Sequence, residues 1–433
     1  MKTYSTFERT IGQFLKRFPS LRSRLIMIYA YFNYIIFSDR KIDVTHPKVK
    51  RRIFNEKNEH FFGYYDKTPW NQDQKKILYH RVNDNMIDLD IVVHNFESDE
   101  SRCLATTKTW NWQQGAMLQW LPPDSKQIVY NNISRDKNII AEIRNVNTGE
   151  LIDILPMPIQ TLRKDGKKAV SLNYRRLAIL RPDYGYCCDA VNFTPDMPDD
   201  KDGIFSIDMQ TKDTRLILSI EYLKKMYNFP RLSYPRHKVN HAMYSPSGNH
   251  FVFLHRCLHS KGKKDRLYFI RDDGTDLRLL LDDDMVSHYS WTNDRQLIVY
   301  ARTKINGDGY YLVDTNSDEV TPIANELWHF GDGHPSMGSN ETFFITDSYP
   351  DRTRMQHLFF YDTQKKYYEE ITRLYAAVRF NGEKRCDFHP RLSPDNRFIS
   401  IDSIEKGKRI MSIFDISKFL EGRDSSMITV AIP

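Results

Sequence analysis

Four histidines stand at the same position relative to a recurring turn. In HAMYS, HYSWT, HPSMG and HPRLS, the histidine lies four residues before the polar residue that opens the turn. These residues are His241, His288, His334 and His389. The chain has only 14 histidines, so a register shared by four consecutive segments is improbable by chance. Imidazoles brought together in this way suit a transition metal, and they equally suit a catalytic cluster with shifted pKa values.

The elements that must position these histidines repeat along the chain. The turn is Ser/Thr-Pro or a related polar pair, and an apolar strand follows it. A second unit is an apolar strand that ends in Asp or Asn before another polar turn. Its seven anchors are Asn95, Asn145, Asp208, Asp272, Asp314, Asp362 and Asp415. They lie 42 to 64 residues apart, and seven strand-rich units of this length predict an all-β fold, a seven-bladed β-propeller. Two stacked β-sandwiches are the alternative, but they predict no repeat of fixed phase.

In a propeller the segment before the turn is the innermost strand, so the four histidines are expected to converge at the mouth of the central channel. Blades one and two break the register, because Tyr64 and Leu118 occupy the equivalent place. The third blade lacks a clear first unit, and SLNYRRLAILRPDYGYCC takes its place. We expect this irregular blade to carry functional residues.

Other side chains near these positions are suited to an acidic sugar. Aromatic faces stack on sugar rings and Asp or Gln supplies directed hydrogen bonds, while Arg pairs with a carboxylate and Tyr transfers protons. The predicted sugar contacts are Tyr64, Asp66, Trp112 and Gln114, with Arg236, Arg256 and Arg391 for an acidic group and Arg181 and Tyr184 from the third blade. Core packing is the competing explanation for most of the aromatic residues in these segments.

The positive charge of the chain is concentrated at its N-terminus. Residues 1–52 hold 12 Lys/Arg against 3 Asp/Glu, whereas the whole chain has a net charge of +7, so residues 53–433 are nearly neutral. The apolar run from Leu25 to Phe37 is too short to cross a bilayer and lacks a cleavage site for a signal peptidase. We therefore predict a helical basic arm over residues 1–52 and a propeller over 53–433. Residues 1–40 would contact a membrane surface; a helix packed on the propeller is the equal alternative.

The cysteines indicate the cellular compartment, and the absence of several motifs weakens some classes of function. The five cysteines are odd in number and form no CxxC, which favours a reducing compartment. We expect a cytoplasmic protein, peripheral at the inner membrane surface, with no nucleic-acid partner. The sequence has no Walker loop, GxGxxG, GxSxG or HExxH motif, which weakens nucleotide-dependent, hydrolase-triad and zinc-protease functions.

Three stretches resemble a known family. VNHAMYSPSGNHFVFLHR, DGHPSMGSNETFFITDSYPD and CDFHPRLSPDNRFISIDS are similar to the propeller repeats of oligogalacturonate lyases and of the related lyases that cut ulvan. The resemblance implies a seven-bladed propeller that cleaves uronic-acid polymers by β-elimination, with manganese held by three histidines and a glutamine. His288, His334 and His389 would match the metal histidines and His241 the neighbouring active-site histidine. The glutamine is absent, and Asp332 would replace it as an oxygen ligand.

The resemblance also implies roles in the chemistry. β-Elimination needs a base for the C5 proton, a positive group at the uronate carboxylate and a proton for the leaving oxygen. His241, a metal or Arg181, and Tyr184 would fill these roles. The expected ligand is an acidic oligo- or polysaccharide of surface-polysaccharide metabolism, and the expected cofactor is Mn or another divalent transition metal. A non-catalytic glycan-binding or scaffold propeller is the alternative, and a protein-interaction propeller would leave the histidines unexplained.

Overall fold

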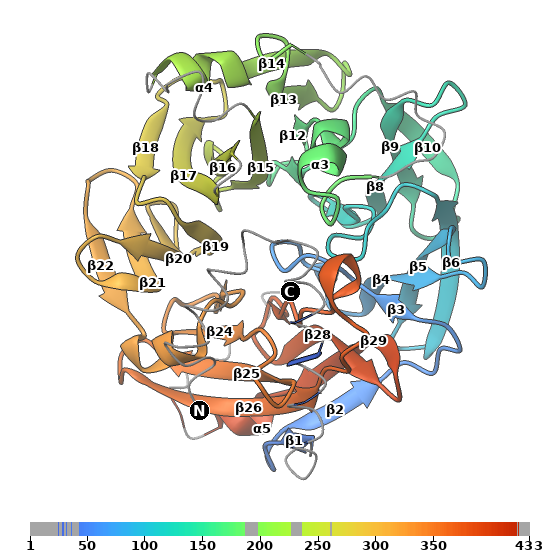
Figure 1. Ribbon diagram of the computed structural model, residues 1–433. Coiled ribbons are helices and arrows are strands. Elements are labelled where there is room, and N and C mark those ends of the chain that lie inside the picture. Colours follow the sequence, from blue (N-terminus) through green and yellow to red (C-terminus); the bar gives the residue numbers. More distant parts are fainter. Residues whose placement is uncertain are drawn as a thin grey trace.

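The computed structural model is a ring of seven antiparallel sheets around a central axis (Figure 1). It describes residues 43–186, 198–226, 236–259, 262–421 and 423, together with Leu25, Ile28, Tyr29, Phe32 and Ile36. Within each sheet the neighbouring strands are consecutive in the sequence, except that two strands near the N-terminus join the two sheets formed by the last strands of the chain. The all-β, seven-bladed propeller predicted from the repeat is therefore confirmed, whereas the predicted N-terminal helix falls almost entirely outside the described residues.

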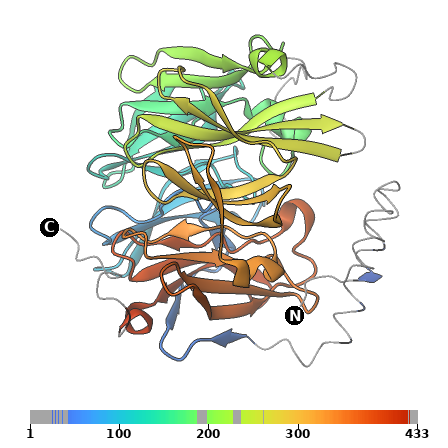
Figure 2. The same ribbon diagram turned by 90° about the vertical axis from the view of Figure 1, so that its left-hand side faces the viewer.

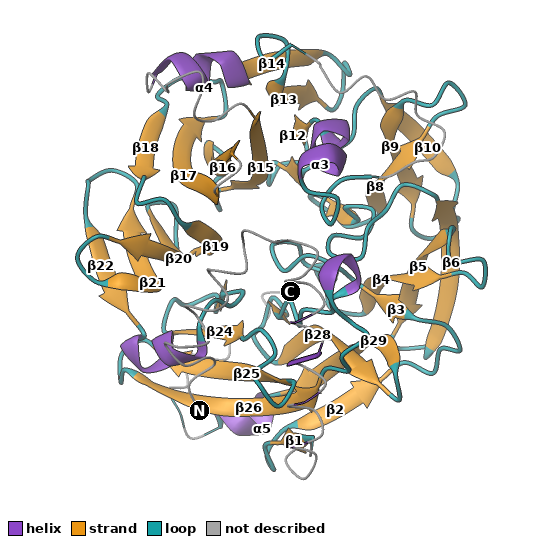
Figure 3. Ribbon diagram, viewed as in Figure 1, coloured by secondary structure: helices purple, strands orange, loops and turns teal. Residues whose placement is uncertain are grey.

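The first three blades come from the N-terminal half of the chain. Blade one consists of β3 (His60–Phe61), β4 (Lys76–Val82), β5 (Leu89–Asn95) and β6 (Glu100–Thr107). Blade two consists of β7 (Gln119–Leu121), β8 (Gln127–Ile133), β9 (Ile139–Asn145) and β10 (Leu151–Leu155). Blade three consists of β11 (Thr161–Leu162), β12 (Lys168–Leu172), β13 (Gly203–Asp208) and β14 (Thr214–Ser219), with helices α3 (Tyr174–Leu180) and α4 (Ile220–Met226). Figure 3 shows α4 at the outer rim and α3 nearer the centre.

The last four blades carry the histidines. Blade four consists of β15 (Arg236–Tyr244), β16 (His250–His259), β17 (Gly262–Arg271) and β18 (Arg278–Leu281). Blade five consists of β19 (Val286–Trp291), β20 (Gln296–Thr303), β21 (Gly307–Asp314) and β22 (Val320–Ile323). Blade six begins after the 3₁₀ helix η3 (Asn325–Phe330) and consists of β23 (Ser336–Met337), β24 (Phe343–Asp347), β25 (Met355–Asp362) and β26 (Tyr367–Tyr375). Blade seven follows η4 (Gly382–Lys384) and consists of β27 (Arg391–Leu392), β28 (Phe398–Glu405) and β29 (Lys408–Asp415), before helix α5 (Ser417–Leu420).

Strands from the N-terminus complete the last two blades. Strand β2 (Lys50–Ile53) pairs antiparallel with β29, and β1 (Val44–Thr45) adds a fifth strand beside β26. Arg51 secures β2, because its guanidinium pairs with Glu405 at 3.2 Å and donates to the hydroxyl of Ser412. Both strands lie mainly in the segment that the sequence analysis assigned to the N-terminal arm. The ring is thus closed by the two ends of the chain.

The Asp/Asn anchors of the repeat have a local structural cause. Asn145, Asp208, Asp314 and Asp362 each end the third strand of a blade, and each Oδ1 accepts hydrogen bonds from the backbone N–H groups two and three residues later. This Asx turn starts the connection to the fourth strand. The phase of the sequence repeat is therefore the phase of the blades.

Each blade is sandwiched between two neighbours, and its central strands are apolar on both faces. All eight residues of β25 and all five of β24 are buried. The core is accordingly a series of clusters between adjacent sheets, such as the one joining Phe343, Phe360, Ile399 and Phe414. Figure 2 shows the blades from the side, with β16 and β17, in yellow, reaching beyond their neighbours on one face.

The structure corrects the description of blade three. The first unit of that blade lies at β11 and β12, where TLRKDGKKAVSL forms the two strands and their turn. From Asn173 onward, the described part of the stretch SLNYRRLAILRPDYGYCC instead follows β12 and forms α3 and the segment that carries Tyr184. The turn was missed because Arg-Lys-Asp-Gly replaces the Ser/Thr-Pro pair. The irregular segment is an insertion between the second and third strands.

Candidate functional site

The four histidines that share a register do meet. His241 lies in β15, His288 in β19, and His334 and His389 lie just before β23 and β27. The ring centroids of His288 and His334 are 3.9 Å apart, and those of His334 and His389 are 4.4 Å apart. All four rings lie 4.9 to 6.4 Å from the ring of Tyr64. Their exposed fractions are 1% to 5%, so we call these four histidines, with Tyr64, the buried histidine cluster.

Tyr64 reaches the cluster from a tightly held loop after β3. The carboxylate of Asp402 accepts hydrogen bonds from the backbone N–H groups of Phe62 and Gly63, both at 2.9 Å. Arg391 donates to the carbonyl of Gly63 at 2.7 Å and pairs with Asp402 at 3.1 Å. The predicted sugar-binding Arg391 is therefore committed to supporting this loop, with 1% of its surface exposed.

The carboxylate of Asp332 orients the ring of His288 through its Nδ1 atom. Nδ1 of His288 lies 3.0 Å from Oδ1 of Asp332, and the hydroxyl of Ser287 donates to Oδ2 of the same residue at 2.5 Å. The carboxylate is therefore occupied on both oxygens. Asp332, which the sequence analysis placed among the metal ligands, is instead positioned to fix the ring of His288 with Nε2 as its outward nitrogen.

Asp347, at the end of β24, orients two further histidines. Its Oδ1 accepts from the backbone N–H of His334 at 2.7 Å and lies 2.8 Å from Nδ1 of the same ring. Its Oδ2 accepts from the backbone N–H of His389 at 3.2 Å. A carboxylate on Nδ1 leaves Nε2 of His334 as the outward nitrogen, which is the arrangement of a metal-binding histidine.

Two of these imidazoles and a third carboxylate form a candidate metal site. Nε2 of His334 and Nε2 of His389 are buried and have no hydrogen-bond partner. Asp387 joins them, and one ligand atom from each of the three residues lies within 4.8 Å of the others. Two imidazoles and a carboxylate are ligands that Mn, Fe or Zn accepts. The residues present therefore fit a divalent metal, with Asp387 rather than Asp332 as the oxygen donor.

The protonation states within the cluster differ. Burial, with His288 as the next cause, holds the pKa of His241 well below its usual value, so its ring is neutral, and neither nitrogen has a hydrogen-bond partner. Burial also lowers the pKa of His334, but Asp347 outweighs it and raises that pKa overall. Nε2 of His241 lies 3.7 Å from the carboxylate of Asp66, whose own pKa burial raises. The cluster thus holds an unprotonated imidazole suited to accept a proton.

Arginine and tyrosine side chains border the cluster on one side. The ring of Tyr184 lies 5.7 Å from that of Tyr64, and Arg181 lies 4.2 Å from the ring centroid of Tyr184. Arg385 donates to the hydroxyl of Tyr184 at 3.3 Å and pairs with Asp183 at 2.8 Å. The predicted Tyr184 and Arg181 are therefore next to the cluster, with a second arginine that the sequence analysis did not single out.

The remaining predicted sugar contacts are dispersed. Trp112 packs in blade one against Phe61 and Trp110 and beneath Arg409, away from the histidines. Arg236 is exposed at the start of β15. Gln114 and Arg256 are buried; the Oε1 atom of Gln114 has no hydrogen-bond partner, and Arg256 pairs with Asp265 and donates to Asn240.

Several residues of the site were missed although the sequence carries a signal for them. Asp387 stands two residues before His389 in DFH, just as the predicted Asp332 stands two residues before His334 in DGH. Asp347 and Asp402 occupy the same place in the repeats FFITDS and FISIDS, and both accept backbone N–H groups from the innermost segment of the next blade. Comparing the second strands of the blades, as well as the first, would have found them.

No family model matches this chain, and no curated protein matches it. Solved structures do match. An oligogalacturonate lyase in complex with manganese has a TM-score of 0.59 at 13% identity, over 87% of this chain and 97% of that chain. An oligogalacturonate lyase from Vibrio parahaemolyticus has a TM-score of 0.57 at 14% identity, over 87% and 98%. The chain has the fold of an oligogalacturonate lyase.

That likeness extends to other propellers. A puromycin-hydrolysing peptidase from Mycobacterium tuberculosis has a TM-score of 0.50 at 9% identity, over 79% of this chain and 50% of that chain. Identities this low establish the fold alone, and functions differ widely on one fold. Among the described residues, no helix is both long enough and apolar enough to cross a membrane.

Proposed function

We propose that the protein binds an acidic, uronate-containing glycan at the buried histidine cluster and cleaves it by β-elimination. The observation that carries this proposal is the convergence of four imidazoles, two of them oriented by carboxylates, with a tyrosine and arginine border. General acid-base chemistry requires a neutral imidazole, and His241 supplies it. The fold that this chain shares with oligogalacturonate lyases supports the same chemistry by analogy only.

The proposed roles follow from the surroundings of each side chain. His241 takes the proton from C5 of the uronate, the electron pair forms the C4–C5 double bond, and the C4–O bond breaks. Tyr184 gives its proton to the leaving oxygen, and Arg385 stabilises the phenolate that remains, since it already donates to that hydroxyl. Arg181, beside the Tyr184 ring, is the counter-charge for the uronate carboxylate.

A metal fits the same scheme. His334, His389 and Asp387 would hold it, and the ring centroid of His288 is 3.9 Å from that of His334. A divalent ion there would neutralise the uronate carboxylate and so acidify the C5 proton. We propose manganese or another divalent transition metal, in keeping with the manganese complex of the structurally similar lyase.

Access to the site favours a short ligand. Tyr64 is 3% exposed and Tyr184 is 3% exposed, and we propose that a sugar reaches the imidazoles when these two rings move aside. A chain end or a short oligosaccharide needs a smaller opening than the middle of a polymer. We propose that such a glycan belongs to surface-polysaccharide metabolism, with the basic arm of residues 1–40 placing the protein at the cytoplasmic face of a membrane.

The test is formation of an unsaturated sugar. The full chain, supplied with Mn²⁺, is incubated with oligogalacturonates, oligoglucuronates and ulvan fragments, and the C4–C5 double bond is followed by its ultraviolet absorbance. His241→Ala and Tyr184→Phe should each reduce the rate by about 10²- to 10⁴-fold. The matched control is His250→Ala, because His250 lies in the same blade but outside the cluster, against the carbonyl of Asp294.

Two results would contradict the lyase. One is an absence of unsaturated product from every acidic glycan and metal. The other is an equal loss of rate in the His250→Ala control. Saturable glycan binding without cleavage, unchanged by His241→Ala, would instead establish a glycan-binding propeller.

A further inference from the structure

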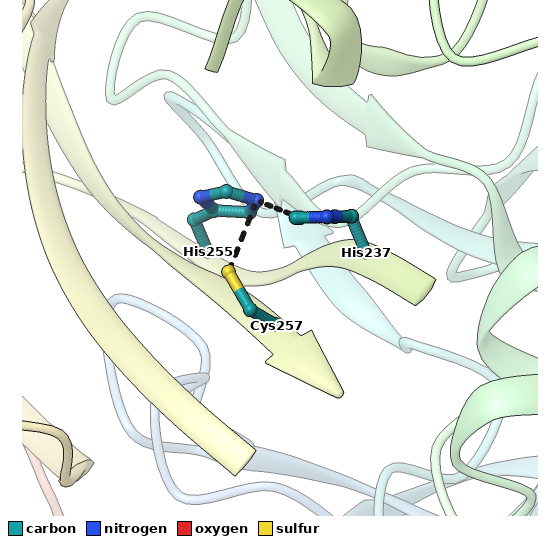
Figure 4. Close-up of side chains that lie close together, drawn as sticks. All are labelled: His237, His255 and Cys257. Atoms are coloured by element: carbon teal, nitrogen blue, oxygen red, sulfur yellow. Dashed lines mark hydrogen bonds between the residues drawn. The ribbon is translucent and has the colours of Figure 1, made fainter. Parts of the chain in front are cut away.

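A second group of metal-binding side chains lies in blade four, in the hairpin formed by β15 and β16. It consists of His237, His255 and Cys257, and one ligand atom of each lies within 4.8 Å of the other two (Figure 4). Nδ1 of His237 is 3.1 Å from Nε2 of His255, and Sγ of Cys257 is 3.9 Å from the same nitrogen. The exposed fractions are 2%, 0% and 0%.

The strand pairing brings these side chains together. His237 is directly opposite Cys257 in the antiparallel ladder. His255 and Cys257 are two residues apart in β16, so they project from the same face of the sheet. The three ligands therefore sit on one rigid two-stranded surface, which is a good platform for a metal because the ligands need no loop to position them.

The distances between the ligand atoms suit a tetrahedral or trigonal ion. Bonds of about 2.0 to 2.1 Å to imidazole nitrogen and about 2.3 Å to thiolate sulfur place neighbouring ligand atoms roughly 3.3 to 3.8 Å apart. The separations of 3.1 and 3.9 Å lie on either side of this range. The third separation, between the ligand atoms of His237 and Cys257, is within 4.8 Å.

The type of ligand selects the metal. Two imidazoles and a thiolate favour zinc over manganese, magnesium or calcium, which prefer oxygen ligands. We propose that His237, His255 and Cys257 bind a zinc ion that fixes the β15–β16 hairpin, at a site separate from the buried histidine cluster. This site does not depend on the proposed lyase activity, because none of its three ligands takes part in it.

The charges around the group are compatible with such an ion. Arg266 approaches Sγ of Cys257 to 3.5 Å, and the same guanidinium is paired with Asp282 at 2.7 Å. A guanidinium beside sulfur stabilises a thiolate, and the aspartate offsets its repulsion of a cation. Burial raises the pKa of the Cys257 thiol to about 12, so the metal must displace the proton and zinc affinity rises with pH.

The position of the zinc site in the sheet indicates which strands a bound ion would stabilise. Arg256 lies between His255 and Cys257 in β16 and therefore points to the opposite face, where it pairs with Asp265 at 2.9 Å and donates to Asn240. Asn240 immediately precedes His241, in the bulge where His241 has a φ of +54°. A zinc ion on one face would thus hold the strands that carry Arg256 and the His241 bulge on the other.

Cobalt(II) substitution tests this directly, because a cobalt–thiolate bond has an intense charge-transfer absorption in the near ultraviolet. The full chain, freed of metal and titrated with Co²⁺, should develop this band and lose it when Zn²⁺ is added. In the zinc-loaded His334→Ala protein, in which the histidine cluster lacks one of its proposed ligands, elemental analysis should find about one zinc that resists dialysis. Absence of the band from the wild-type chain at saturating Co²⁺ would overturn the proposal, and this result needs no variant.

Variants test whether the sulfur that binds the metal is that of Cys257. Cys257→Ser should abolish the charge-transfer band and lose the bound zinc. Cys386→Ser is the matched control, because Cys386 is also buried and burial also raises its pKa to about 12, yet it lies outside the group. His334→Ala should leave the band unchanged, since it affects only the histidine cluster. A band that persists in Cys257→Ser, or that disappears equally in Cys386→Ser, would refute the assignment.

Discussion

His80 makes the stability of the propeller dependent on pH in a way that can be worked out from its contacts. It is fully buried, its Nδ1 lies 2.9 Å from the carbonyl of Phe62, and its Nε2 accepts the backbone N–H of Ala116 at 3.2 Å. A ring that donates at one nitrogen and accepts at the other must be neutral. Burial lowers the pKa of His80 to about 3, against about 6.5 in the unfolded chain.

The sign follows from the depressed pKa. Below pH 6.5 the unfolded chain binds a proton at this residue that the folded chain does not, so the free energy of unfolding falls as the pH falls. Each pH unit costs about 1.4 kcal/mol in this window. Between pH 8 and pH 5 the contribution is about 2 kcal/mol, and it would reach about 4 kcal/mol at pH 3.

The assay is urea unfolding of the wild-type chain and of His80→Asn at pH 8 and pH 5. Asparagine keeps the donor to Phe62 but does not titrate. At pH 8 the variant should be less stable by about 1 to 3 kcal/mol, because the N–H of Ala116 loses its acceptor. Between pH 8 and pH 5 the difference should shrink by about 2 kcal/mol, since only the wild type loses the His80 contribution.

A histidine with the opposite shift provides the control. Burial lowers the pKa of His357, but hydrogen bonds with Asp351 and Glu370 outweigh it and raise the pKa above its usual value. Its stabilisation is complete below pH 6.5 and is lost as the pH rises through the raised pKa. His357→Gln should therefore cost more at pH 5 than at pH 8. If His80→Asn and wild type kept the same difference at both pH values, the reasoning about His80 would be refuted.

Three further substitutions or truncations test the support of the site. Gly115→Ala should destabilise the chain by about 2 to 4 kcal/mol, measured by urea unfolding, because its Cβ would lie 2.2 Å from the His80 ring at a φ of +58°; an effect below 1 kcal/mol would contradict the close contact. Asp402→Asn should cost about 2 to 4 kcal/mol by the same measurement, since it breaks the ion pair with Arg391; Asp362→Asn, which keeps the accepting oxygen of a turn, should be nearly neutral. Deletion of residues 1–53 should lower the free energy of unfolding by about 3 to 4 kcal/mol. It should also favour association through the exposed edge of β29, which light scattering would detect. Unchanged stability and an unchanged scattering mass per chain would show that β2 is dispensable.

The sequence predicted the part of the site that depends on one strand of each blade. The four histidines that share a register form a cluster because equivalent positions on the innermost strands face the same central axis. Tyr64 shares that register, and it lies at the centre. These predictions needed only the phase of the repeat, which the Asx turns fix locally.

What the sequence analysis missed depends on contacts between strands and between blades. Asp347 accepts the backbone N–H of His389 from the neighbouring blade; its place in the repeat can be compared between blades, but its partner is known only once the blades are assembled. Arg391 has the charge expected of a residue that binds an acidic sugar, but its guanidinium already pairs with Asp402 and donates to the carbonyl of Gly63. Trp112 has an aromatic face that could stack on a sugar ring, but this ring packs against Phe61 instead. Such competing partners are visible only after the sheets are assembled.

The closure of the ring by β2 sets an order for folding during synthesis. Arg51 bonds with Ser412, 361 residues later, so β2 leaves the ribosome long before its partner β29 exists. At about 5 to 20 residues per second, it waits roughly 20 to 70 s with an unpaired edge. Blades one to five have all their own strands and can form in that interval, whereas blade seven requires the first strands of the chain to return. A nascent chain halted before Ser412 would keep an open ring, and its N-terminal edge would be a natural target for chaperones.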